Sequence, residues 1–420
     1  MTDLAQRRAA LLGPNVPTFY QDPVHIVRGE GVWLWDADGK RYLDCYNNVA
    51  HVGHCHPHVV AAIARQAATL NTHTRYLHEG ILEYVERLTA TFSHDLAQAI
   101  MVCTGSEAND IALRMAQAVT GKRGFIATDA TYHGNTAAVS QLSTRRPPIG
   151  GYADHVRLVP SPSTLQPLGG SPEAQADVFA GHIRVAIAEL EEAGIGFAGL
   201  MLCPTFANEG LPDLPQGFLK PAVAACHAAG GLFLCDEVQP GFGRTGTGFW
   251  GYDWHGVAPD VVTIGKPMGN GHPVAAVVAR PDVMAAFREA FGYFNTFGGN
   301  PVSCAAASAV LDVIEQDGLV DHADRVGRYT LQALKDLDHP DIADVRGLGQ
   351  FYGVEFMRDG EPAADFVAFL VEELRRRGVL LGMIGPGRNV LKIRPPMPFD
   401  ERHADHLMTT LQEVLNTCPK

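Results

Sequence analysis

The feature that most constrains the fold is the alternation of short apolar runs with longer segments of helical periodicity between about residues 99 and 279. Several runs lack polar–apolar alternation, so we expect strands covered on both faces. Strand–helix–strand order predicts an α/β fold with a mostly parallel sheet between helices. The expected strands are residues 99–103, 125–128, 199–203, 232–235, 261–264 and 274–279. The expected helices are residues 106–119, 181–193 and 217–229.

The pattern changes after Asn300, where a helix predicted over 303–316 leads into helices and short strands of different spacing. We therefore expect a large domain of residues 51–302 and a smaller α+β domain of residues 303–420, joined by an N-terminal segment of residues 1–50. Within that segment, Asp38-Gly39 marks the turn of a β-hairpin. Residues 147–172 contain six prolines and are interpreted as a long surface excursion.

Charge and composition limit the partners. Thirty-three Lys and Arg against 46 Asp and Glu give a net charge of −13. Nucleic acids and anionic membranes favour a basic surface, so we expect neither as a partner, although a local pocket for a small anion is compatible with this charge. No apolar run approaches the ~18 residues of a membrane span, and the N-terminus lacks the apolar core of a signal peptide. The eight cysteines are sparse, so we interpret them as free thiols and expect a cytoplasmic protein.

Ligands of open α/β sheets bind outside the carboxyl ends of the strands, so the residues that follow each strand are informative. Thr104-Gly105-Ser106 follows the first expected strand and opens a helix. Gly105 allows close backbone approach, and Ser106 with the free amides of the first turn can hold a phosphate. A plain N-cap is the alternative. Tyr132 follows the second strand, where its ring either stacks on a flat ligand or packs within the loop.

Two ionisable residues follow later strands. Asp236 ends an apolar strand, where a carboxylate needs a partner such as a cationic ring nitrogen, an arginine or a metal. Lys266 lies in a Gly-rich turn after another strand, where burial would make its amine a nucleophile; a lysine that reaches solvent is the alternative. A phosphate cradle, a stacking tyrosine, an acid and a desolvated lysine are together what pyridoxal 5′-phosphate requires.

These residues stand in motifs that resemble the class III aminotransferases of the fold-type-I pyridoxal-phosphate enzymes, and the resemblance extends from about residue 24 to 398. The motifs are Gly105-Ser106-Glu107-Ala108, Tyr132-His133-Gly134, Asp236-Glu237-Val238-Gln239, Gly241-Phe242-Gly243-Arg244, Lys266 and Thr296-Phe297-Gly298-Gly299-Asn300-Pro301. Residues 42–57 and 265–273 look closer to one branch, the aminotransferase-like phospho-lyases that act on ethanolamine phosphate or 5-phosphohydroxylysine.

The resemblance implies a role for each matching residue. Lys266 would bind the cofactor covalently and Asp236 would keep its pyridine nitrogen protonated. Tyr132 and Val238 would cover the two ring faces, and Gln239 would bond the ring hydroxyl. The cofactor phosphate would be held by Gly105 and Ser106, and by Thr296 from the neighbouring subunit. That last contact implies a homodimer or a dimer of dimers.

The chain departs from the class at two positions. Cys203 stands where many class III enzymes have a glutamate, and Lys392 stands where others have an arginine for the substrate carboxylate. A lysine makes no planar bidentate grip on a carboxylate. Arg394 lies two residues on in an extended run, so both cations should point to one face and suit a phosphate dianion. Pairing of Arg394 with a surface carboxylate is the alternative.

Asn47, Asn48 and His51 belong to a loop that lines the substrate pocket in related enzymes, so we expect them as further substrate contacts. His51, His54, Cys55, His56 and His58 are too tightly spaced for the usual paired zinc ligands, and we expect no metal.

Three functions are compatible with these motifs. The first is a phospho-lyase that releases phosphate and ammonia from a phosphorylated amine; for ethanolamine phosphate the remaining product is acetaldehyde. The second is an ω-aminotransferase that passes the amino group to a keto acid. The third is a non-catalytic pyridoxal-phosphate protein, against which the intact Lys266 and Asp236 argue.

Overall fold

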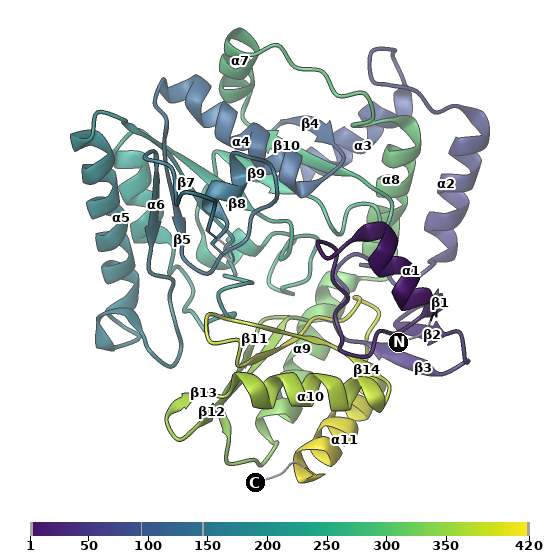
Figure 1. Cartoon of the computed structure of the whole chain (residues 1–420). Helices are drawn as coiled ribbons and strands as arrows, with labels where there is room; N and C mark the ends of the chain where they lie inside the picture. The colour runs from purple at the N-terminus through teal and green to yellow at the C-terminus, as the bar shows by residue number, and fades with distance from the viewer. Residues whose placement is uncertain (1–2, 94, 145–146, 418–420) are drawn as a thin grey trace.

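The computed structural model describes residues 3–93, 95–144 and 147–417. A seven-stranded sheet forms the centre of the upper part of the molecule in Figure 1. Strands β9, β8, β7, β5 and β6 run parallel, and β10 is antiparallel to both β9 and β4. The α/β fold with a mostly parallel sheet is therefore confirmed. In sheet order the strands are β4 (Gln98–Val102), β10 (Ala275–Ala279), β9 (Val261–Ile264), β8 (Leu232–Asp236), β7 (Phe197–Leu202), β5 (Gly124–Thr128) and β6 (Val156–Val159).

Helices cover both faces of this sheet because successive side chains of each buried strand point to opposite faces. In β8, Leu234 packs into the core under α4 and α7, whereas Phe233 and Cys235 pack into the core formed with α5, α6 and α8. The helices of this region are α2 (Pro57–Thr69), α3 (Glu79–Ala90), α4 (Gly105–Thr120), α5 (Gln175–Glu192), α6 (Lys220–Ala228), α7 (Pro281–Ala290) and α8 (Pro301–Gln316).

All six expected strands are present with bounds shifted by at most two residues. The prediction for residues 147–172 was incomplete, because this stretch contains β6, an edge strand paired in parallel with β5. Its four residues are too short to show a periodicity of their own. Single-turn 3₁₀ segments lie at Val139–Leu142, Leu168–Gly170 and Gly251–His255.

The C-terminal part forms an antiparallel sheet in the order β11-β12-β16-β15, with β13 paired to β12. Three helices pack against it in the lower part of Figure 1. The strands are β11 (Ile342–Gly347), β12 (Tyr352–Arg358), β13 (Glu361–Pro362), β15 (Gly382–Ile384) and β16 (Val390–Ile393). The helices are α9 (Leu319–Lys335), α10 (Ala364–Arg376) and α11 (Glu401–Thr417).

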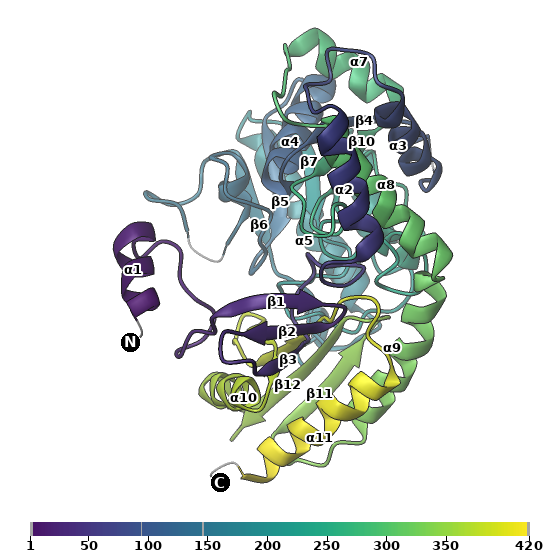
Figure 2. The same ribbon diagram turned by 90° about the vertical axis from the view of Figure 1, so that its right-hand side faces the viewer.

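The N-terminal segment pairs with this C-terminal part. After α1 (Asp3–Leu12), strands β1 (Ile26–Glu30), β2 (Trp33–Asp36) and β3 (Arg41–Asp44) form a sheet that β14 (Val379–Leu380) extends in parallel with β3. The expected hairpin is the β2–β3 pair, and Asp36 Oδ1 accepts the turn amides of Asp38 and Lys40. Figure 2 shows this sheet beside β12 and α10, while α1 stands away from the rest.

Helix α8 packs on α2 and α3, and its apolar residues belong to the core of the seven-stranded sheet. This packing favours a boundary near Gly318, after α8, over one at residue 303; the domain boundaries stay a prediction. No helix among residues 3–93, 95–144 and 147–417 is both long and apolar enough to cross a membrane.

The fold predicts that Leu43 joins the two ends of the chain, because its fully buried side chain lies in the core formed by α9–α11. We expect Leu43→Ala to lower the free energy of unfolding by about 2–5 kcal/mol, the cost of a buried cavity. Val185→Ala on the exposed face of α5 is the control and should change it by less than about 0.5 kcal/mol. Urea unfolding measures the free energy of unfolding of both variants. An equal decrease in the two would contradict the placement of Leu43 in the core of the C-terminal part.

Candidate active site

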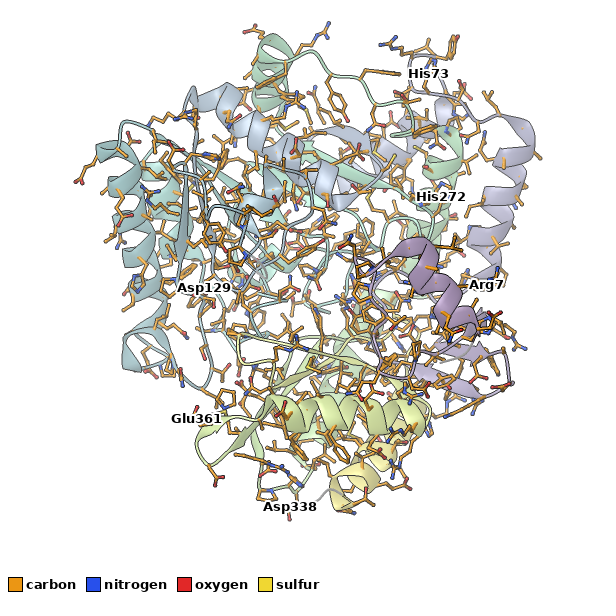
Figure 3. All side chains as sticks on the ribbon, viewed as in Figure 1. Arg7, His73, Asp129, His272, Asp338 and Glu361 are labelled. Carbon is orange, nitrogen blue, oxygen red and sulfur yellow. The ribbon has the colours of Figure 1, made fainter. Side chains whose placement is uncertain are left out.

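A cavity of about 280 Å³ lies at the carboxyl edge of the seven-stranded sheet. Loops that follow β4, β5, β7, β8 and β9 contribute to its wall, as the placement rule for open α/β sheets predicts. His272, labelled in Figure 3, lines it beside α8, where its Nε2 lies 2.9 Å from Ser303 Oγ. The lining residues are Val49, Cys103, Thr104, Gly105, Ser106, Tyr132, His133, Gly134, Cys203, Asp236, Val238, Gln239, Gly265, Lys266, Gly271, His272, Pro273 and Val274.

The N-terminus of α4 opens onto this cavity. Thr104 is its N-cap, and its Oγ1 accepts the Glu107 amide at 3.1 Å. The amides of Gly105 and Ser106 have no carbonyl to bond within the helix, so they are free to hold an anion. A Cβ on Gly105 would lie 3.1 Å from Val238 Cγ2, which explains the glycine at this close approach. Capping and anion binding are thus compatible at this helix end.

Asp236 is buried, and its carboxylate is held by three donors. His133 Nδ1 lies 2.7 Å and Asn109 Nδ2 3.1 Å from Oδ2, and the Val238 amide donates to Oδ1 at 3.0 Å. Thr263 Oγ1 donates to Asn109 Oδ1 at 2.6 Å, so β9 supports the same network. These bonds fix an anionic oxygen pair at the cavity wall.

Sequence reasoning gave no role to His133 or Asn109. His133 lies in the quoted Tyr132-His133-Gly134 motif, and Asn109 lies one helical turn after Gly105 on the same face of α4. Both positions could have been recognised as partners of Asp236. The partner is therefore a histidine and an amide rather than the arginine or metal that the sequence left open.

Lys266 follows β9, and its side chain is exposed within the cavity that it lines. The surrounding protein desolvates the amine and Arg394 adds a like charge, so the pKa of Lys266 is lowered although Asp236 acts in the opposite direction. A lowered pKa increases the fraction of neutral amine, which is the nucleophilic form. Tyr132 lines the same cavity half-buried, and its hydroxyl donates to Asn135 Oδ1 at 2.8 Å.

Gln239 joins the cavity to two buried cations. Lys392 Nζ donates to its Oε1 at 2.9 Å and Arg394 Nη1 donates to the same oxygen. Because the Arg394 guanidinium can only donate, the amide is oriented with Oε1 toward it, and its Nε2 is left as the donor. Lys392 and Arg394 share one side of the extended run, as expected, but they lie behind Gln239 rather than on the cavity wall.

Three residues expected at the substrate end are used elsewhere. Asn47 Oδ1 accepts the Val49 amide at 2.9 Å, and Asn48 Nδ2 donates to the carbonyls of Val238 and Gln239. His51 is fully buried between Phe242 O and Arg244, and burial followed by the Arg244 charge lowers its pKa to about 3. It is thus a neutral structural residue near pH 7. None of the three residues lines the cavity, and their contact with a substrate stays a prediction.

The remaining predicted residues lie outside the cavity. Thr296 is exposed and does not line the cavity of its own chain. His54 pairs with Asp44 at 2.7 Å and His58 with Asp312 at 2.7 Å. Within the described ranges, no group of three or more His, Cys, Asp or Glu side chains could hold a metal ion.

The residues around the cavity fit pyridoxal phosphate. The free amides of α4, the carboxylate of Asp236 and the amine of Lys266 match its phosphate, its ring nitrogen and its aldehyde, respectively. Gly105 supports this fit, because a Cβ there would crowd Val238 beside the free amides. The fold and the site thus define a pyridoxal-phosphate-dependent enzyme of fold type I.

Comparison with known proteins supports the assignment to the pyridoxal-phosphate-dependent enzymes. The family described as aminotransferase class-III matches residues 17–415. A Drosophila melanogaster protein named alanine–glyoxylate aminotransferase 2-like is 39% identical over 99% of this chain and 87% of its own. A Caenorhabditis elegans ethanolamine-phosphate phospho-lyase homolog is 33% identical over 98% and 93%, respectively. An Arthrobacter phospholyase, solved in complex with phosphoethanolamine, has a TM-score of 0.95 and 42% identity over 99% of this chain and 100% of its own.

The chain therefore belongs to the class III aminotransferase family, which is pyridoxal-phosphate-dependent. The resemblance in the motifs is confirmed, and phospho-lyases as well as aminotransferases are among the relatives.

We expect Lys266→Ala to abolish turnover and the absorbance of the covalently bound cofactor, because the chain loses the amine that projects into the cavity. The fold should remain, since the truncated side chain is exposed within the cavity rather than packed. Absorbance spectra, circular dichroism and activity measure the three effects. Activity near that of the wild type would contradict the assignment of Lys266.

We expect Asp236→Asn to lower the rate by at least ~10²-fold, because a neutral amide no longer stabilises a protonated ring nitrogen. The shape of the side chain is kept, so the contacts with His133 and Asn109 can largely persist. Asp338→Asn, at the far end of the small domain in Figure 3, is the control. Steady-state kinetics give the turnover rate of both variants. An unchanged rate in Asp236→Asn would mean that Asp236 has only a structural role.

Proposed function

We propose that this protein is a pyridoxal-phosphate-dependent phospho-lyase that converts a phosphorylated amine, with ethanolamine phosphate as the favoured substrate, to an aldehyde, ammonia and phosphate. For ethanolamine phosphate the aldehyde is acetaldehyde. The observation that carries the proposal is a cluster of buried basic side chains beside the cavity that form no ion pair with any described residue.

The cluster consists of Arg244, Lys392 and Arg394, all buried. In the part of the chain that the structure describes, none of them forms an ion pair, and Asp44 and Glu209 attract their charge only from a longer distance. Carbonyl oxygens hold them instead: Gln350 and Pro395 for Arg244, Ala207 for Lys392 and Tyr46 for Arg394. Burial and the charge of Arg394 lower the pKa of Arg244 to about 9.

Buried charge on the two arginines that no ion pair offsets is costly, and an anion brought into the cavity would offset that cost. The whole chain is acidic, with a net charge of −13, so this positive region is a local feature. A dianionic phosphate offsets two charges and a carboxylate only one. The relatives support this choice, because a 42% identical phospholyase was solved with phosphoethanolamine, another name for ethanolamine phosphate.

Each residue of the site then has a task. Gly105 and Ser106 would bind the cofactor phosphate through the free amides of α4, and Tyr132 and Val238 would cover the ring. Gln239 would donate to the ring hydroxyl. Asp236 would hold positive charge at the ring nitrogen, and Lys266 would remove the proton from the substrate carbon that bears the amino group. When bound, the cofactor supplies the electron sink for that proton loss.

Elimination follows from the substrate's own chemistry. Once the proton has left, the electron pair displaces the phosphate on the adjacent carbon, and water then releases ammonia and acetaldehyde. Arg394 and Lys392 stabilise the departing phosphate electrostatically. An ω-aminotransferase would use the same proton abstraction but needs a keto acid acceptor, and the 39% identical aminotransferase-like relative keeps that alternative open for the test.

The test is to incubate the holoenzyme with ethanolamine phosphate and no keto acid, and to assay phosphate and acetaldehyde. We expect equal amounts of both products over many turnovers. Release only after pyruvate or glyoxylate is added, with alanine or glycine as a product, would replace the lyase by an aminotransferase.

We also propose a homodimer in which Thr296 reaches the partner's cofactor phosphate. Thr296 lies in an exposed loop with Phe297, which is 70% exposed, and Phe294 of this loop contacts His73 of the loop that precedes α3. Leu77, in the second loop, is 99% exposed. An apolar surface of this kind is typical of an interface. Sedimentation velocity should give about 90 kDa, twice the 45.2 kDa chain, and a monomer with full activity would contradict the proposal.

We expect Arg394→Ala to raise KM for ethanolamine phosphate by ~10–100-fold, because a buried positive charge next to the cavity is lost. Cofactor affinity should change little, because Lys392 still holds Gln239. Arg402→Ala, on the exposed start of α11, is the control. Steady-state kinetics and cofactor titration separate the two effects. Loss of cofactor affinity with an unchanged KM would contradict a role of Arg394 in substrate binding.

A further inference from the structure

Lys392 has the hydrogen-bond environment of a neutral amine. Its Nζ donates to Ala207 O at 3.0 Å and to Gln239 Oε1 at 2.9 Å, and no third acceptor is within bonding distance in the described residues. A neutral amine has two N–H donors and both are used, whereas an ammonium has three and would leave one unsatisfied. An unsatisfied buried donor costs about 1–3 kcal/mol.

The charges that face Lys392 also favour the neutral form. Arg394 follows the same strand, β16, and Lys266 lies across the cavity after β9; both repel a charge on Lys392. Glu209 and Cys203, from the loop after β7, act in the opposite direction. Burial is the largest contribution, and together these groups hold the pKa of Lys392 well below its usual value.

Lys392 can nevertheless take up a proton when an anion binds in the cavity. The ring of Phe351 lies 5.2 Å from Nζ, within the range of a cation–π interaction. Gln239 and Cys203, which flank Lys392, both line the cavity, so an anion there would be one side chain away. An opposite charge at that range favours the ammonium form.

We propose that Lys392 is uncharged while the cavity holds no anion, and that it takes up one proton from the buffer when a dianion binds. Anion binding at this site is thus coupled to proton uptake, and Lys392 sets its preference for dianions. This inference rests on the proposed function only in taking a phosphorylated amine as the natural ligand. An arginine at this position would be charged throughout and would lack the coupling.

The experiment is calorimetric titration of the holoenzyme with sulfate, a dianion that does not itself titrate between pH 7 and 9.5. Measurement at pH 8 in two buffers of different ionisation enthalpy gives the number of protons taken up. Lys392→Arg and Lys392→Met are the variants, and Lys335→Met on the exposed end of α9 is the control. Cofactor absorbance, recorded in parallel, reports any protonation change at Lys266.

We expect the wild type and Lys335→Met to take up close to one proton per sulfate. Their affinity should fall by up to tenfold per pH unit above pH 8, because binding then requires a proton that is scarcer. Lys392→Arg should bind sulfate without uptake and with an affinity that is constant over the same range. Lys392→Met should bind more weakly and also without uptake.

Equal proton uptake in the wild type and in Lys392→Arg would overturn the inference, and so would a wild type that binds no sulfate. Lyase activity decides the proposed function separately. Release of phosphate and acetaldehyde without coupled proton uptake would support the proposed function and contradict the role of Lys392. Coupled proton uptake without product release would support the role of Lys392 and contradict the proposed function.

Discussion

The parallel pairing of β8 with β9 is the constraint on which the site depends. Its register sets Asp236 beside Thr263, three residues before Lys266, so the acid and the amine emerge at one edge of the sheet. Thr263 and Asn109 then tie β9 and α4 to the carboxylate. Both strands are buried on both faces, and a slip by one residue would exchange the two cores that their side chains fill. The register of these two strands therefore fixes the position of Asp236 relative to Lys266.

A second constraint is the meeting of the two domains at Gln239. The large domain supplies Gln239 from the loop after β8, and the small domain supplies Lys392 and Arg394 from β16. Lys392 also bonds Ala207, and Arg346 bonds the carbonyls of Gly210 and Leu211 in the same large-domain loop. Arg346 also pairs with Asp344 and Glu355, whereas Lys392 and Arg394 are held by carbonyl and amide oxygens, which leaves them available to an anion.

Much of the site was predictable because it depends on short-range patterns. Apolar runs and the residues after them located the sheet edge, Asp236, Lys266 and the α4 cradle, and the motifs gave the family. Strand β6 was missed because four residues carry little periodicity. Asn48 and His51 were expected at the substrate and instead hold surrounding loops, since the direction of a side chain in a turn depends on what packs against it.

The sequence by itself determined the α/β fold, the family and the dependence on pyridoxal phosphate. The fold follows from local periodicities, where backbone geometry fixes which side chains share a face, and the family follows from the resemblance of several short motifs along the chain. Only the tertiary structure decided that His133 supports Asp236, that Gln239 faces Lys392 and Arg394, and that neither of these forms an ion pair with a described residue. The contacts involved join residues 103 to 155 positions apart, and a local pattern carries no information on which distant side chains meet in a packed interior.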